Sequence, residues 1–257
     1  ASLKVSQSYF LKVWNEKRAF IKLQGGSPFA LCTTCEEFDD KLRRHRSNAV
    51  QSAAAIRDKD EHLAVVKAER QVYYRNRQEA TSNKGQFLSL ILDGADQSAF
   101  GLPHFYRKTK ASSGIKIPIK LYGVLSHGRG SFAYTVPPNA PTGVNLTIEI
   151  LYRVLRHVVG TEERVPKTLT VQLDNTSGQN KNNFLMAFLA LLVGWNVFDE
   201  VYVNFLPVGH THEDIDQMFS RFAVDNRAHD ATTPADLLEN CQRAFYPVPL
   251  TGKIETQ

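Results

Sequence analysis

The sequence predicts an α/β protein with a mixed β-sheet flanked by helices and a long-helix arm at its N-terminal side. Residues 87–222 alternate short apolar runs, typical of buried strands, with longer segments of helical periodicity. The first three runs follow one another before any helix intervenes, which favours a sheet of mixed strand direction. Residues 29–84 contain neither glycine nor proline, which favours continuous helix before the sheet begins.

The segment before the sheet predicts one long helix, or two helices with a short join, over residues 36–80. Ile56, Leu63 and Val66 recur there at roughly helical spacing among charged residues. The stretch "TSNKGQ" then supplies serine, asparagine and glycine, which are residue types that end helices.

The rest of the chain alternates between strand and helix patterns. We expect strands at residues 87–93, 116–128, 131–138, 167–175 and 199–209, and helices at residues 140–159, 182–198, 211–224 and 233–245. The helix at 182–198 is apolar nearly all round, which predicts that it is buried. Up to residue 222 the order is β-β-β-α-β-α-β-α, the order of the ribonuclease H-like fold. We therefore divide the chain into a helical basic arm, residues 1–84, and a ribonuclease H-like catalytic core, residues 85–257.

Basic charge is concentrated in the arm. Residues 41–80 hold ten Lys or Arg against five Asp or Glu, which accounts for the whole net charge of +5. A local basic excess is typical of binding to a polyanion such as nucleic acid, and a solvated helix face is the alternative. The arginines expected to bind phosphate without sequence preference are Arg43, Arg44, Arg46, Arg70, Arg75 and Arg77.

Acidic residues end the first and fourth predicted strands. Asp93 closes "LILD" and Asp174 closes "VQLD", and in this fold the two strands lie side by side. Carboxylates that close repel one another unless a cation lies between them, and oxygen ligands suit Mg²⁺ or Mn²⁺. The third ligand should come from the helix after the last strand, where Asp216 is the first choice and Glu213 the second. Two such ions can activate a water or hydroxyl and stabilise the leaving oxygen in phosphodiester chemistry.

The stretch "GHTHEDID", residues 209–216, allows other interpretations. Acids at a helix start also favour the helix dipole and act as caps. A metallophosphoesterase would use "GHTH" as a metal motif but needs further motifs that "DGAD" and "DNTSGQNKN" do not supply. A metallo-β-lactamase-type site would need histidine where Ile215 stands. In the two-ion interpretation, His210 at the strand-to-helix corner contacts a phosphate or shuttles a proton.

The loop after the fourth strand carries amides and a lysine that suit phosphate oxygens at a helix N-terminus. These residues are Asn175, Gln179, Asn180 and Lys181. The alternative is that the amides cap the turn and the helix.

Cys32 and Cys35 have the C-x-x-C spacing of half a zinc site. His45 and His62 are candidates for the other half, but both fall in predicted helix, and Cys241 is remote in the sequence. The alternative is two packed thiols at a helix start. A thioredoxin-like role is not expected, because no βαβ context surrounds the pair.

The stretches "LDNTSGQNKN" and "GHTHEDIDQMF" resemble a poorly characterised eukaryotic transposase-like domain family with a ribonuclease H-like, DDE-type core. The resemblance extends over most of the chain and implies a three-acid site of Asp93, Asp174 and Asp216. Asp96 would replace Asp93 if the strand were shifted in register. Glu149 is either a fourth acid near the ions or a solvent-facing residue.

These observations together predict a nuclear, transposon-derived enzyme. We expect metal-dependent hydrolysis or strand transfer on nucleic acid, with DNA favoured over RNA. The alternative is a domesticated, inactive module for DNA binding or assembly, and the arm either packs on the core or pairs with a second copy in a homodimer. No apolar stretch reaches the roughly 20 residues of a membrane span, and "ASLKVSQSYF" lacks a secretory segment.

Overall fold

The computed structural model describes residues 32–107, 114–176, 178–207, 209–210 and 213–254, together with residues 6, 9 and 13. The chain forms two compact units, Ala1–Leu31 and Cys32–Gln257. The boundary expected between residues 84 and 85 falls inside this second unit, so residues 32–84 of the arm belong to the same compact unit as the core.

From residue 32 to residue 84 the arm consists of two helices with a short join, one of the two forms expected. They are α2 (Thr33–Arg44) and α3 (Ala49–Ser82), and the Asn48 side chain caps α3 by accepting a hydrogen bond from the backbone of Gln51. The face that α3 buries includes Val66 and Tyr73, seven residues or two helical turns apart. The apolar pattern was misleading at Ile56, which is 50% exposed.

The sheet is mixed and has six strands in the order β5-β4-β1-β2-β3-β6. The strands are β1 (Phe87–Gly94), β2 (Lys120–Ser126), β3 (Gly130–Val136), β4 (Thr168–Leu173), β5 (Glu200–Phe205) and β6 (Leu250–Lys253). β1, β2 and β3 pair antiparallel, β4 and β5 run parallel to β1, and β6 runs parallel to β3. The predicted α/β class with a mixed sheet is confirmed, and β6 is an addition that the sequence analysis missed.

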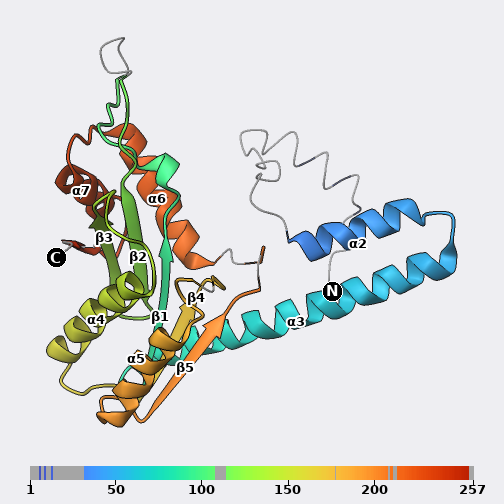
Figure 1. Ribbon diagram of the computed structural model, residues 1–257, viewed down its shortest axis with the longest axis horizontal. Coiled ribbons are helices and arrows are strands. Elements are labelled where there is room, and N and C mark those ends of the chain that lie inside the picture. The colour runs from blue at the N-terminus through green and yellow to red at the C-terminus, as the bar shows by residue number, and fades with distance from the viewer. Residues whose placement is uncertain are drawn as a thin grey trace. The chain divides into compact units, whose positions relative to one another are not determined.

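Helices cover both faces of the sheet (Figure 1). α4 (Val144–Thr161) and α5 (Asn183–Gly194) pack on one face, where they share a buried apolar cluster with β1, β3 and β4. α6 (Asp214–Ala228), α7 (Pro234–Ala244) and Tyr73 of α3 pack on the other. Tyr73 is buried among core side chains, and it ties the arm to the sheet.

The expectation that α5 is buried all round was wrong. Its residues Leu185, Leu189 and Leu192 are buried against the sheet, whereas Phe184 is 73% exposed and Trp195, just after the helix, is 67% exposed. A helix in an outer layer buries the one face that meets the sheet, so apolar composition alone did not predict its depth. Among the described residues, no helix has the length and apolarity to cross a membrane.

Candidate functional site

Two of the three predicted acids lie side by side at the carboxyl ends of adjacent parallel strands. β1 and β4 pair with Ile91 opposite Gln172, and Asp93 and Asp174 each lie two residues beyond that pair. Both aspartates are half-buried and line a small pocket that Ile215 of α6 closes. The backbone N–H of Gly94 donates a 2.7 Å hydrogen bond to Asp93. The predicted meeting of the two strand ends is therefore present in the fold.

Asp216 lies in the first turn of α6, and its negative charge acts on Asp93. Burial, followed by the negative charges of Asp216 and Asp174, raises the pKa of Asp93 to about 7, although the hydrogen bond from Gly94 opposes the rise. Asp216 also takes part in a capping box, in which it accepts a 3.0 Å hydrogen bond from the backbone of Glu213. The arrangement concentrates negative charge around Asp93, and oxygen ligands gathered in this way suit a divalent ion.

The alternative acids have other roles in the structure. Asp96 caps the short 3₁₀ helix η1 (Gln97–Ala99) and accepts hydrogen bonds from the backbone and side chain of Ser98, so it does not take the place of Asp93. Glu149 pairs with Arg153 on α4 at 2.6 Å. Glu213, the second-choice ligand, is the buried N-cap of α6, which begins three residues later than expected.

The loop after β4 is held by one of its predicted phosphate-binding amides. Asn180 is 5% exposed; its Nδ2 donates to the carbonyl of Asp174 at 3.2 Å, and its Oδ1 accepts from Thr147 at 3.2 Å. This amide therefore fixes the backbone that carries Asp174. Lys181 is exposed and lies 5.5 Å from the ring centroid of Phe205, and Asn175 donates its backbone N–H to the Asp174 carboxylate.

Gln179, the remaining predicted phosphate-binding residue of the loop after β4, is half-buried.

The six predicted phosphate-binding arginines have different environments. Arg70 and Arg77 pair with acids at the start of α6: Arg70 Nε lies 3.4 Å from Glu213, and Arg77 Nη1 lies 3.2 Å from Asp214. Both side chains therefore join α3 to α6.

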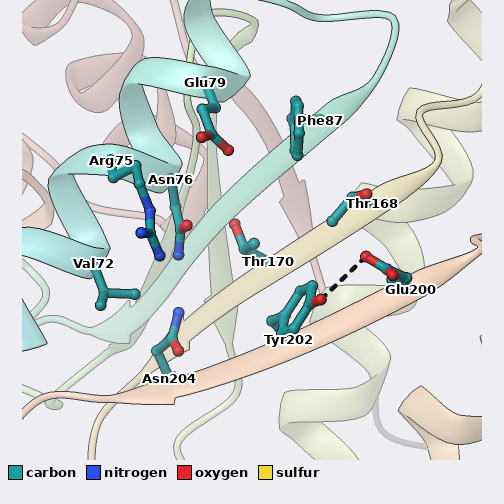
Figure 2. Close-up of a pocket in the computed structure, with 10 residues that line it drawn as sticks. All are labelled: Val72, Arg75, Asn76, Glu79, Phe87, Thr168, Thr170, Glu200, Tyr202 and Asn204. Carbon is teal, nitrogen blue, oxygen red and sulfur yellow. Dashed lines mark hydrogen bonds between the residues drawn. The ribbon is translucent and has the colours of Figure 1, made fainter.

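The other four arginines are exposed. Arg43 and Arg44 pair with Asp40 on the same helix, and Arg46 lies in the turn between α2 and α3. Arg75 points into a groove of about 320 Å³ between α3 and the sheet (Figure 2).

Polar side chains line this groove along its length. The α3 wall consists of Val72, Arg75, Asn76 and Glu79. Thr170 of β4 and Asn204 of β5 lie across the groove from Arg75 and Asn76 (Figure 2). Asn204 is paired in register with Gln172, which itself lines the pocket of Asp93 and Asp174. The groove therefore adjoins the acid pocket at the carboxyl ends of the strands.

A buried polar network that the sequence analysis missed connects α3, β1, the turn after β2 and α6. Tyr73 donates a hydrogen bond to Asp214, His127 Nε2 lies 3.1 Å from Asp214, and His127 Nδ1 lies 2.9 Å from Ser89 Oγ. Burial alone would raise the pKa of Asp214, but the hydrogen bonds from His127 and Tyr73 and the charge of Arg77 hold it below its usual range. Because Ser89 is 3% exposed, we interpret this network as a support for α6 rather than a nucleophile with its base.

The cysteine pair is part of a four-residue cluster. Cys32 Sγ lies 3.4 Å from His62 Nε2, Cys35 Sγ lies 3.4 Å from His210 Nε2, and the two Nε2 atoms lie 3.2 Å apart. All four ligand atoms lie within 4.8 Å of one another, and both cysteines are free thiols. The cluster has the ligand types and spacing to hold a metal ion such as zinc. In the described part of the chain, no other group of three or more His, Cys, Asp or Glu side chains is gathered so closely.

Sequence reasoning anticipated part of this cluster. It identified Cys32 and Cys35 and offered His62 as a partner; the other candidate, His45, ends α2 and lies outside the cluster. It assigned His210 to phosphate or proton chemistry, whereas the structure places His210 beside the two cysteines. Metal-site motifs are recognised by short spacings between ligands. His210 is 148 residues from His62, so no such spacing points to it.

The turn that carries His210 fits closely against the start of α2. Gly209 has φ +77°, and a Cβ added there would lie 2.5 Å from the Cα of Cys32. Arg70 Nη2 donates to the carbonyl of His210 at 3.2 Å. Burial, with the nearby charges of His62 and Arg70, lowers the pKa of His210, which favours the neutral imidazole that metal ions bind.

Comparisons with known proteins add a family but no activity. Searches of curated proteins and of solved structures found no match. The model of one family, described as a domain of unknown function, matches residues 109–257, which include Asp174, His210 and Asp216 but not Asp93 or the arm. Because this match covers more than half of the 257 residues, the chain belongs to the DUF7869 family.

Proposed function

We propose that this protein cleaves or transfers phosphodiester bonds of nucleic acid, using Mg²⁺ or Mn²⁺ bound by Asp93, Asp174 and Asp216. The observation that carries the proposal is the electrostatic coupling of these acids. Asp93 and Asp174 end neighbouring parallel strands, and the charges of Asp174 and Asp216 both raise the pKa of Asp93. An all-carboxylate donor set suits hard divalent ions.

The strand order supports a ribonuclease H-like core. From β3 to β5 the order is β3-β2-β1-β4-β5, with three antiparallel strands followed by two that run parallel to β1. This is the arrangement that the order β-β-β-α-β-α-β-α implies for that fold. β6 extends the sheet beyond β3, at the edge farthest from β5, and does not alter the neighbours of β1.

The bound ions would supply Lewis acidity and a metal-activated water or hydroxyl. The chain's own residues hold the acids in place: the buried amide of Asn180 fixes the backbone of Asp174, and the capping box fixes Asp216 in the first turn of α6. Because the pKa of Asp93 is raised to about 7, part of the protein carries a proton there near neutral pH, and Asp93 would lose it when an ion binds.

The groove of Figure 2 is the substrate path that best fits this site. It adjoins the acid pocket where Gln172 pairs with Asn204, and at that end Arg75 and two asparagine side chains offer hydrogen bonds to phosphate oxygens. Glu200 lies at the other end of the strand. We propose that nucleic acid, DNA in preference to RNA, enters along the amide-lined end, and that the protein acts in the nucleus.

The test is nicking of a labelled DNA duplex with Mn²⁺ or Mg²⁺. We expect wild-type protein to nick, and Asp93→Asn and Asp174→Asn to lose activity to background. Asp96→Asn is the matched control, because it removes a nearby aspartate charge and keeps an N-cap residue. Nicking that survives in both Asp93→Asn and Asp174→Asn would exclude the acids as the catalytic site.

The second candidate is an inactive nucleic-acid-binding module. The observation that favours it is the use of Asp216 in the capping box. In addition, among the described residues the three carboxylates do not form a group whose ligand atoms all lie within 4.8 Å of one another. In that case all four proteins would bind duplex in a salt-sensitive way, and none would nick it with either ion.

A further inference from the structure

We propose that Cys32, Cys35, His62 and His210 bind one zinc ion, which joins the start of α2, the middle of α3 and the turn before α6. The proposal does not require the acid site to be catalytic. It rests on the geometry of the four ligand atoms, the chemistry of the donor set and the close fit of the turn at Gly209.

The distances in the cluster match those between ligands of a tetrahedral zinc ion. With Zn–N of about 2.0–2.1 Å and Zn–S of about 2.3 Å, tetrahedral angles place two nitrogens about 3.3 Å apart and sulfur and nitrogen about 3.5 Å apart. In the structure the two Nε2 atoms are 3.2 Å apart, and the two Sγ to Nε2 distances are 3.4 Å. All three observed distances therefore agree with one central ion.

The donor set selects the metal. Two thiolates and two imidazoles are ligands of zinc rather than of Mg²⁺ or Ca²⁺, and four protein ligands leave no open position for a substrate. The site would therefore be structural. The alternative is a metal-free hydrogen-bonded cluster, but the two Nε2 atoms can share only one proton between them, and thiols are weak donors.

The three segments that the ion would join are far apart in the sequence. Cys32 and His62 are 30 residues apart, and Cys35 and His210 are 175 residues apart. A cross-link over such a span removes much conformational freedom from the unfolded chain, so the ion should contribute substantially to stability. It would also fix the turn that leads into α6.

Zinc content of the full chain, purified without chelators and measured by plasma mass spectrometry, tests the proposal. We expect about one zinc per chain in wild type, and less than about a fifth of that in His62→Gln and Cys35→Ser, because each loses one of four ligands. The matched controls, His45→Gln and Cys241→Ser, remove the same residue types outside the cluster and should keep about one zinc.

Cobalt substitution keeps the test informative if a ligand variant does not fold. Wild-type protein loaded with Co²⁺ should show the visible absorption of a tetrahedral ion and a thiolate-to-cobalt charge-transfer band. His62→Cys, which supplies a third thiolate, should keep the metal and strengthen that band. Wild-type protein that neither contains nor takes up zinc, or ligand variants that keep full zinc content, would overturn the assignment.

Discussion

The electrostatic environment of Asp93 predicts that replacing it with asparagine makes the metal-free protein more stable, although the same change should abolish the proposed activity. In metal-free protein, Asp93 has a pKa of about 7 against an ordinary value of 3.8. The folded state therefore favours the protonated form. The sign follows: the stabilising contribution of Asp93 is complete below about pH 4 and is lost as the pH rises through about 7. Asp93→Asn removes this loss, because asparagine stays neutral and can still accept the hydrogen bond from Gly94.

The magnitude comes from the size of the pKa rise. About three pKa units at about 1.36 kcal/mol each give an upper limit of about 4 kcal/mol at pH 8. Because Asp93 is only half-buried, solvent screening reduces this, and we expect Asp93→Asn to be more stable by about 2 kcal/mol. For a domain of this size, that corresponds to a rise in melting temperature of about 4–8 °C.

The assay is thermal or urea unfolding of wild type, Asp93→Asn and Asp96→Asn at pH 5 and pH 8. Mg²⁺ and Mn²⁺ are omitted without adding a strong chelator, so that any ion in the cysteine–histidine cluster stays bound. The stability advantage of Asp93→Asn should be larger at pH 8 than at pH 5, and Mn²⁺ should reduce it by stabilising wild type. An advantage that does not grow with pH, or a variant less stable than wild type at pH 8, would refute the electrostatic argument.

Three further predictions follow from other parts of the molecule. Gly209→Ala should lower zinc content several-fold although it removes no ligand, because the added Cβ would meet the backbone of Cys32. Gly160→Ala, whose added Cβ meets no atom within 4 Å, should leave the zinc content unchanged. Full zinc content in Gly209→Ala would contradict the packing argument. Arg75→Ala should weaken duplex binding and lower by about one the slope of the logarithm of the binding constant against the logarithm of salt concentration. Arg57→Ala, on the same helix but outside the groove, should change neither. Equal effects of the two substitutions would exclude the groove as the binding site. Asp214→Asn should cost about 2–3 kcal/mol in urea unfolding, because it disrupts a buried charged network, and a cost near zero would show that the network contributes little.

Local sequence patterns predicted most of the elements around the acid site. Period-two and apolar runs identified β1 to β5, and the acids that end β1 and β4 followed directly from those runs. β6 escaped notice because its four residues include a glycine and carry little apolar character. The depth of α5 also escaped, since composition does not say how many layers cover a helix.

The cysteine–histidine cluster shows where sequence reasoning loses information. C-x-x-C is a local pattern and was recognised, but His210 reaches it through a contact between residues 175 positions apart. Its nearest neighbours in the sequence suggested phosphate chemistry instead. Only the fold brings the turn after β5 against the start of α2, and nothing in the sequence around Gly209 indicates that this glycine approaches Cys32.

Helix α3 of the arm and the core form one structural unit around the start of α6. Arg70 and Arg77, expected to bind phosphate, pair with Glu213 and Asp214, and Tyr73 adds a hydrogen bond from the same helix. The proposed zinc ion would add a further link to the turn just before α6. Because Asp216 lies in the first turn of that helix, the same contacts that hold the arm in place also set the position of the third acid. The basic helix α3 therefore has a structural role next to the acid site, and under the proposed function phosphate binding would fall to the exposed arginines that make no contact with α6.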